Sequence, residues 1–127
     1  MRVLVFGTFD HLHPGHRFVL TEAMKRGDVT AIIARDSNVE RIKGRLPSQN
    51  EDLRVQAVRA SFPDVTAVLG DPDDFLMPVR VVQPDLILLG YDQRLPPGVS
   101  ENDLICPVER LPAHRPGEFK SSLRLQR

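Results

Sequence analysis

Short apolar runs recur along the chain, and the segment after each of them carries a different, helix-like pattern. The runs cover residues 2–6, 29–34, 65–70, 86–92 and a stretch within 104–111. They are rich in Val, Ile and Leu at successive positions, which is typical of strands buried on both faces of a parallel sheet. Because strands and helices alternate, we expect an α/β fold: a doubly wound, Rossmann-like parallel sheet of about five strands with helices on both faces.

Helix signals lie between these runs. Apolar residues at helical spacing predict helices over residues 16–27 and 51–60, and a short helix is expected around residues 37–42. The segment 71–85 opens with an Asp-Pro pair suited to a cap and a first helical position. Pro78 inside that segment predicts a kink or two short turns.

Length and charge narrow the class of protein. The 127 residues suit one domain, residues 1–127, with a single core. Lys plus Arg and Asp plus Glu both total 17, so no overall charge favours a nucleic acid or membrane partner. The lone cysteine, Cys106, is expected to be a small buried apolar residue. No signal segment or membrane-spanning stretch is visible, so we expect a cytoplasmic protein.

Unusual segments follow three of the predicted strands. "GTFDHLHPGH" follows the first, "GYDQ" the fourth and a polar, proline-containing tail the fifth. In doubly wound sheets, ligands bind at the carboxyl ends of the strands. The three segments therefore predict a ligand site at one edge of the sheet.

The first of these loops has the features of a phosphate site. A helix beginning near Gly15 directs unpaired backbone N–H groups at the loop. Gly7 allows a tight turn, Gly15 allows close approach of a ligand, and Thr8 offers a hydroxyl. His13 and His16 are three residues apart, so both imidazoles can face one anion at the helix start.

Two other interpretations of the histidines stay open. Histidines can hold zinc, but no cysteine pair lies nearby to complete a site. They can also be solvated surface residues, and His11 suits that interpretation, or a lining role, best. The loop matches neither the dinucleotide GxGxxG pattern nor a Walker loop.

These residues resemble the cytidylyltransferase-like nucleotidyltransferases, whose signature is GTFD followed by HxGH. The matching residues are Gly7, Thr8, Phe9, Asp10, His13, Pro14, Gly15 and His16. Both motifs stand in a strand, loop and helix context. The resemblance continues through "ARDSNVERIKGRLP", "NEDLR" and "PDLILLGYDQ", and so covers most of the chain.

The resemblance implies an enzyme that joins a nucleoside triphosphate to a phosphorylated or hydroxylated acceptor and releases pyrophosphate. The reaction is one in-line displacement at the α-phosphorus, so catalysis rests on positioning and charge stabilisation. By resemblance, His13 and His16 contact the triphosphate, with His16 nearest the α-phosphate. Lys43 supplies a cation to the α-phosphate and the acceptor phosphate. On the residues alone, Lys43 and Arg45 are also compatible with a solvated basic loop.

Mg²⁺ is the cofactor that the resemblance implies. It would bridge phosphate oxygens and be held mainly by the substrate. Asp10 is a candidate for holding that ion or for orienting a histidine. No other metal ligand is predicted.

The resemblance also assigns nucleotide contacts outside the first loop. Those residues are Arg54, Gly90, Asp92, Ser121, Ser122 and Arg124. On the residues alone, Arg54 can be a surface side chain on a helix and Asp92 a turn cap. Leu123 departs from the family's usual hydroxyl residue within "FKSSLR".

The segments quoted above most resemble the small stand-alone FMN adenylyltransferases of archaea and some bacteria. We therefore expect ATP and FMN as substrates and FAD and pyrophosphate as products. The alternatives are a glycerol-3-phosphate cytidylyltransferase that uses CTP and an inactive nucleotide-binding regulatory module. Gln93 can donate and accept, so it does not decide between adenine and cytosine. By resemblance only, we expect a homodimer.

Overall fold

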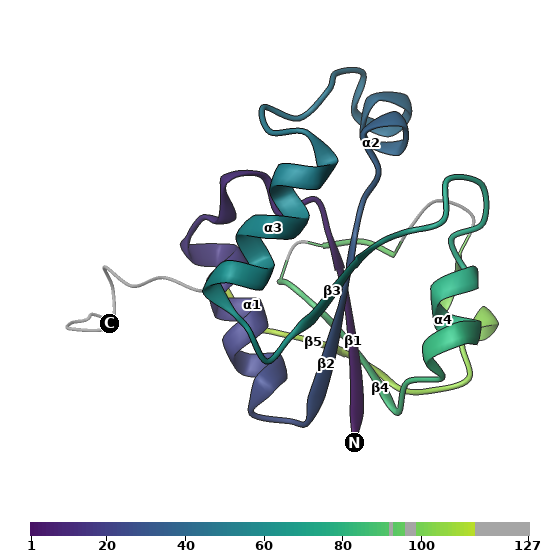
Figure 1. Cartoon of the computed structure of the whole chain (residues 1–127). Helices are drawn as coiled ribbons and strands as arrows, with labels where there is room; N and C mark the ends of the chain where they lie inside the picture. The colour runs from purple at the N-terminus through teal and green to yellow at the C-terminus, as the bar shows by residue number, and fades with distance from the viewer. Residues whose placement is uncertain (92, 96–98, 114–127) are drawn as a thin grey trace.

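The computed structural model describes residues 1–91, 93–95 and 99–113, which form one parallel sheet and its covering helices (Figure 1). The strands are β1 (Arg2–Gly7), β2 (Asp28–Ile33), β3 (Thr66–Leu69), β4 (Leu86–Leu89) and β5 (Val108–Arg110). Their order is β3-β2-β1-β4-β5, and every neighbouring pair is parallel. The predicted doubly wound α/β fold is thereby confirmed.

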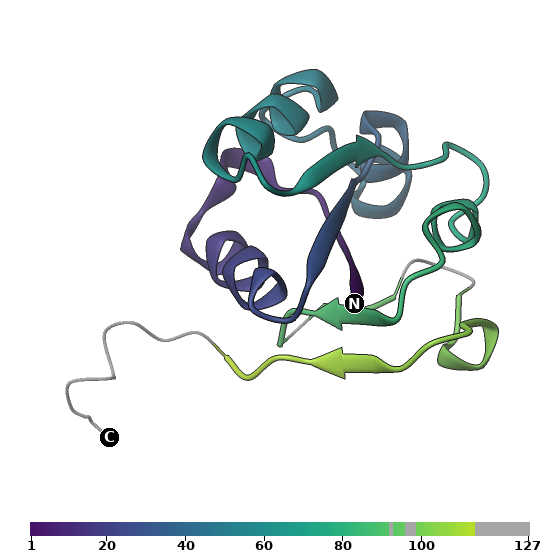
Figure 2. The same cartoon turned by 60° about the horizontal axis from the view of Figure 1, so that its bottom comes forward.

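Helices cover both faces of the sheet. α1 (Pro14–Met24) and α3 (Glu51–Ser61) lie on one side, and α4 (Met77–Val82) lies on the other (Figure 2). Leu20 of α1 and Val58 of α3 are completely buried against one set of strand residues. Val79 of α4 packs against Leu4 and Ile87 on the opposite face. This two-sided burial explains why the strands are apolar at successive positions.

The segment before α4 departs from the sequence-based expectation. The helix expected from residue 71 begins only at Met77, and Pro78 lies in its first turn, where a missing N–H costs no hydrogen bond. Of the two predicted alternatives, the kink is therefore absent, and the segment instead has a turn at residues 75–76 followed by one short helix. The carboxylate of Asp71 instead accepts from the backbone N–H groups of Asp73 and Asp74.

Cys106 is only half-buried, where the sequence predicted a buried residue, and this partial burial raises the pKa of its thiol.

α2 (Asp36–Lys43) has a different relation to the sheet. It stands beyond the carboxyl end of β2, near the top of Figure 1, and not over either face. Its last residue, Lys43, is followed by Gly44 with φ 79°, the left-handed conformation that commonly ends a helix. This placement brings the basic loop after α2 close to the loop after β1. Among the described residues, no helix has the length and apolar character needed to cross a bilayer.

Candidate active site

A cavity of about 360 Å³ lies where the loops after β1 and α2 meet. Its lining residues are Thr8, Asp10, His13, His16, Val39, Lys43, Arg45, Leu46, Pro47 and Ser48. The structure therefore brings together the three residues given catalytic roles by resemblance, His13, His16 and Lys43. The apolar part of the wall was not singled out from the sequence, because the contacts of an irregular loop carry no periodic signal.

The two cavity histidines form the start of α1. The backbone N–H of Gly15 donates to His13 Nδ1 at 3.1 Å, and the backbone N–H of His13 donates to His16 Nδ1 at 3.2 Å. The rings stack with centroids 3.6 Å apart and planes inclined by 22°. Because each Nδ1 accepts, a neutral ring carries its proton on Nε2. Both residues can thus present an Nε2–H donor.

His16 is held in its neutral form. Burial lowers the pKa of His16 to about 4, and the nearby charges of His13 and Lys43 lower it further, while Asp10 acts in the opposite direction. A desolvated imidazole beside other cationic groups resists protonation. At neutral pH, His16 is therefore a hydrogen-bond donor and not a cation.

Little of the first turn of α1 is free to bind an anion through its backbone. Pro14 has no N–H, and the N–H of Gly15 already donates to His13 Nδ1. A Cβ on Gly15 would lie 2.9 Å from Cε1 of His13, so Gly15 makes room for an imidazole ring. This corrects the expectation that Gly15 leaves room for a ligand and that the start of this helix offers unpaired backbone N–H groups. Side-chain donors face the cavity instead.

Phe9 packs against His16 without lining the cavity. It has φ 55° and is only 2% exposed, and its ring lies 5.3 Å from that of His16 at 59°. A Cβ on Gly7 would come within 2.7 Å of the Phe9 ring, and φ of Gly7 is not positive. Gly7 therefore gives space to the Phe9 ring, and the turn after β1 does not depend on a positive φ at Gly7. Phe9 does not line the cavity.

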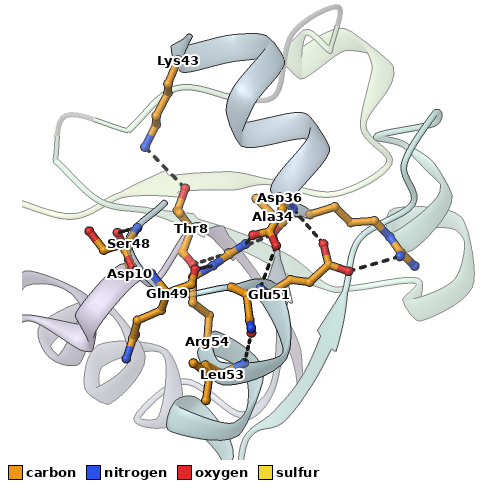
Figure 3. Close-up of polar contacts among 12 residues, drawn as sticks. Thr8, Asp10, Ala34, Asp36, Lys43, Ser48, Gln49, Glu51, Leu53 and Arg54 are labelled. Carbon is orange, nitrogen blue, oxygen red and sulfur yellow. Dashed lines mark hydrogen bonds and ion pairs between the residues drawn. The ribbon is translucent and has the colours of Figure 1, made fainter. Parts of the chain in front are cut away.

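Lys43 enters the cavity from α2. Its Nζ donates to the hydroxyl of Thr8 at 3.4 Å, as Figure 3 shows. This contact joins the end of α2 to the loop after β1, although the two residues are 35 apart in sequence. Arg45 also lines the cavity. A phosphate in the cavity therefore meets one or two cations beside the histidine donors.

Asp10 holds the loop after α2. Its carboxylate accepts from the backbone N–H of Ser48 and that of Gln49, both at 2.9 Å. Burial raises the pKa of Asp10, but these two donors together with the charges of His11 and Arg54 outweigh it, and the pKa lies below its usual value. Asp10 makes no hydrogen bond to the described histidine rings. It nevertheless forms part of the cavity wall as an ionised carboxylate.

Arg54 lies behind the cavity and does not line it. Its side chain is 0% exposed, and it donates to the carbonyl oxygens of Gln49, Thr8 and Ala34 at 2.8–3.0 Å. Its remaining terminal nitrogen donates to Asp36 Oδ1 at 2.7 Å (Figure 3). Because Arg54 is buried behind the cavity wall, it does not make the expected contact with the nucleotide. Arg54 instead ties the ends of β1 and β2 to α2 and α3.

The loop after β4 is fixed by hydrogen bonds within itself and to the neighbouring strands β1 and β5. Gln93 Nε2 donates to the carbonyl of Phe6 at 2.6 Å, and Gln93 Oε1 accepts from the N–H of Gly90 at 3.0 Å. Arg110 donates to the carbonyl of Gly90 at 3.0 Å. Each polar atom of the Gln93 amide thus has one backbone partner, and the two hydrogen bonds fix its orientation. Four other expected nucleotide contacts lie outside the described residues: Asp92, Ser121, Ser122 and Arg124.

His11 does not belong to this cavity. It is exposed, has φ 57°, and its backbone N–H donates to Gln49 Oε1 at 2.9 Å. The structure places it on the surface, as the sequence suggested. Within the described part of the chain, no three His, Cys, Asp or Glu side chains gather as a metal site.

Fold and site together define a class of protein. A doubly wound sheet carries two imidazole donors and a lysine together at the carboxyl ends of its strands. Such a site suits a nucleotidyltransferase, an enzyme that transfers a nucleotidyl group by positioning the substrates and stabilising charge.

Comparison with known proteins gives the family. The cytidylyltransferase-like family matches residues 4–122, nearly the whole chain. The chain belongs to this family. The resemblance seen in GTFD and HxGH is thereby confirmed, and with it the nucleotidyltransferase class.

Several relatives are described as FAD synthase. The protein from Methanoculleus marisnigri is 40% identical over 131 residues, which cover 98% of this chain and 86% of the relative. The protein from Aciduliprofundum boonei is 50% identical over 95 residues, which cover 74% of this chain and 63% of the relative. In the latter comparison the chain spans less than two thirds of the relative's length.

A solved structure has the same fold. The lipopolysaccharide core biosynthesis protein from Thermoplasma volcanium superposes with a TM-score of 0.76 at 32% identity. The match covers 91% of this chain and 98% of that chain. That protein is described as acting in a different biosynthetic process, so likeness of fold does not by itself select the acceptor.

Proposed function

We propose that the protein is an FMN adenylyltransferase that transfers AMP from ATP to FMN and releases pyrophosphate, so that FAD is formed. The observation that carries the proposal is the meeting of His13, His16 and Lys43 at one cavity in a chain whose relatives are described as FAD synthase. The family membership supports the reaction class.

The reaction proposed is a single displacement. A phosphate oxygen of FMN forms a new bond to the α-phosphorus of ATP, and the bond from that phosphorus to the bridging oxygen breaks as pyrophosphate leaves. Negative charge gathers on the α-phosphoryl oxygens and on the leaving group in the transition state. The Nε2–H groups of His13 and His16 donate to these oxygens, and the Lys43 ammonium neutralises charge at the α-phosphate. Fixed donors in a partly desolvated cavity supply the stabilisation.

Mg²⁺ fits the residues at the cavity. The described wall offers one ionised carboxylate, that of Asp10. Mg²⁺ is usually held by one or two carboxylates together with substrate phosphates and water. Asp10 would hold the ion, which when bound neutralises charge on the triphosphate. Because both Asp10 oxygens also accept backbone N–H donors, the carboxylate is already oriented.

The apolar part of the cavity favours a flavin acceptor over glycerol 3-phosphate. Val39, Leu46 and Pro47 line the same cavity as the cations. Leu46 is 57% exposed although it is a large apolar side chain, so a ligand can bury it. An isoalloxazine ring gains from such a surface, whereas a small polar acceptor does not. The homodimer and the cytoplasmic location stay predictions.

The decisive experiment measures pyrophosphate release with each of ATP and CTP against FMN and glycerol 3-phosphate. We expect release with ATP and FMN, dependence on Mg²⁺, and formation of FAD. Turnover only with CTP and glycerol 3-phosphate would replace the substrates but keep the mechanism. Nucleotide binding without release for any pair would support the inactive regulatory module instead.

A further inference from the structure

A buried ion pair lies between the cavity and the sheet. Arg54 is 0% exposed, so its charge requires a partner, and the carboxylate of Asp36 supplies it at 2.7 Å. Asp36 is the first residue of α2, the helix whose last residue is Lys43. The counterion of the buried arginine and the cavity lysine are therefore the two ends of one helix.

Asp36 is fixed by more than the arginine. Its Oδ2 accepts from the backbone N–H of Glu51 at 3.2 Å, and its own N–H donates to Glu51 Oε1 at 2.8 Å. Glu51 is the first residue of α3, so the two helices begin with a reciprocal pair of hydrogen bonds (Figure 3). Each oxygen of the Asp36 carboxylate thus has its own donor: Oδ1 accepts from Arg54 and Oδ2 from Glu51.

The far end of α2 has much weaker support. No described strand or helix packs extensively on α2, and Figure 1 shows it standing clear of both sheet faces. Most of its side-chain anchors lie near its N-terminus: Asp36, Asn38 donating to the carbonyl of Asp71 at 3.4 Å, and the preceding Arg35 donating to the carbonyl of Gly70 at 2.7 Å. Toward the other end, the Arg41 guanidinium lies 5.9 Å from the centroid of the Phe75 ring. At the other end, Lys43 reaches only Thr8 among the described residues. α2 is therefore held more firmly at its N-terminus than at its C-terminus.

The angle at which α2 leaves Asp36 determines where Lys43 lies at the other end of the helix. Seven residues of helix at about 1.5 Å each place Lys43 about 10 Å from Asp36, so a tilt of about 10° at the base moves the lysine by about 2 Å. Displacement of a catalytic group by about 1 Å can cost on the order of a hundredfold in rate.

We propose that Asp36 is a positioning residue for Lys43: its bonds to Arg54 and Glu51 set the angle of α2 and so place the ammonium over the phosphate site beside Thr8. The inference rests on the proposed function only in requiring that the cavity binds phosphate groups, whatever the acceptor. Asp36 touches no substrate in this scheme and acts through Lys43.

The test is a double-mutant cycle between Asp36→Asn and Lys43→Ala. The readouts are kcat with the active substrate pair and the affinity for inorganic pyrophosphate by calorimetry. We expect Asp36→Asn to lower kcat and weaken pyrophosphate binding by on the order of tenfold in the presence of Lys43, and by less than about twofold when Lys43 is already alanine. Such coupling separates positioning from a general loss of stability.

A matched control removes the same charge from the same helix. Glu40 is exposed on α2, and its side chain has no hydrogen bond or ion pair within the described residues. Glu40→Gln should leave both readouts within about twofold of the wild type. Glu51→Ala, which removes one bond of the reciprocal pair, should reproduce the Asp36→Asn pattern at smaller size and serves if Asp36→Asn folds poorly.

Equal effects of Asp36→Asn with and without Lys43 would overturn the inference, and so would no effect at all. Failure of the wild type to bind pyrophosphate would overturn it together with the phosphate site. Pyrophosphate binding with the expected coupling, but without turnover of FMN, would contradict the proposed acceptor and leave the role of Asp36 standing.

Discussion

The imidazole rings of His13 and His16 stack 3.6 Å apart, and each uses Nδ1 to accept a backbone N–H at the start of α1. The same two side chains thus cap a helix and line the cavity. Capping fixes the orientation of each ring before any substrate binds, so the Nε2 donors need no rearrangement. Such preorganisation is what stabilises charge in a transition state.

Replacing His16 by Ala should lower kcat by on the order of a hundredfold or more while changing the dissociation constant for the nucleotide only a few-fold, because the proposed hydrogen bond strengthens in the transition state. The lost cap should cost about 1 kcal/mol of stability. Steady-state kinetics and calorimetry separate the two effects. His11→Ala is the control, since His11 lies on the surface. A variant that binds poorly but turns over normally would refute this role.

The low pKa of His16 predicts a specific pH dependence. In the unfolded chain the group titrates near 6.5, and in the folded protein near 4. As pH falls, the unfolded chain takes up the proton first, so the folded state loses stability between about pH 6.5 and 4 and is unaffected by this group above that window. Urea unfolding of the wild type and of His16→Asn at pH 7 and pH 5 measures it. The variant should lose less stability than the wild type; equal losses would contradict the assignment.

The fold was predictable because it depends on periodicity. Apolar runs flanked by helix signals gave the strand and helix order, and parallel alternation left few topologies. The motif also indicated which histidines face the cavity. The start of α4 was misplaced because Pro72 and Pro78 both suit a first helical turn, and only packing of Val79 against the sheet selects the second.

The errors at the site have a different cause. Arg54 and Gln93 have side chains suited to binding ligands, yet in the structure both donate to backbone carbonyls. Gly15 makes room for the ring of His13. A sequence shows that a side chain can donate hydrogen bonds but not which carbonyl groups irregular loops leave unpaired. Buried loops must satisfy those groups, and long polar side chains are the means.

Arg54→Met should destabilise the protein by about 3–5 kcal/mol, because it leaves the Asp36 carboxylate and three backbone carbonyls without their donor. Urea unfolding measures the loss. Arg59→Met is the control on the same helix: Arg59 is exposed and serves a single carbonyl, that of Ala67, so a smaller loss is expected. Similar losses for both variants would show that burial of Arg54 carries no special energy.

Gln93→Ala should raise KM for the nucleotide several-fold with a smaller effect on kcat. The change frees the carbonyl of Phe6 and the N–H of Gly90, so the loop after β4 loses its attachment to β1. Kinetics with ATP varied at saturating FMN give the two constants. Gln56→Ala, an exposed position on α3, should behave as the wild type. An altered preference between ATP and CTP, with unchanged KM for ATP, would mean that Gln93 does read the base.

Leu46→Ser tests the apolar wall and with it the acceptor. If an isoalloxazine ring packs on Leu46, loss of that surface should weaken FMN by about 1–2 kcal/mol, or roughly tenfold in KM, and leave KM for ATP unchanged. Leu53→Ser is the matched control, because Leu53 is 50% exposed on α3 but does not line the cavity. A rise in KM for ATP alone would place the nucleotide against Leu46. No change in either KM would remove the apolar wall from the argument for a flavin, since an exposed leucine that meets no ligand has no part in choosing one.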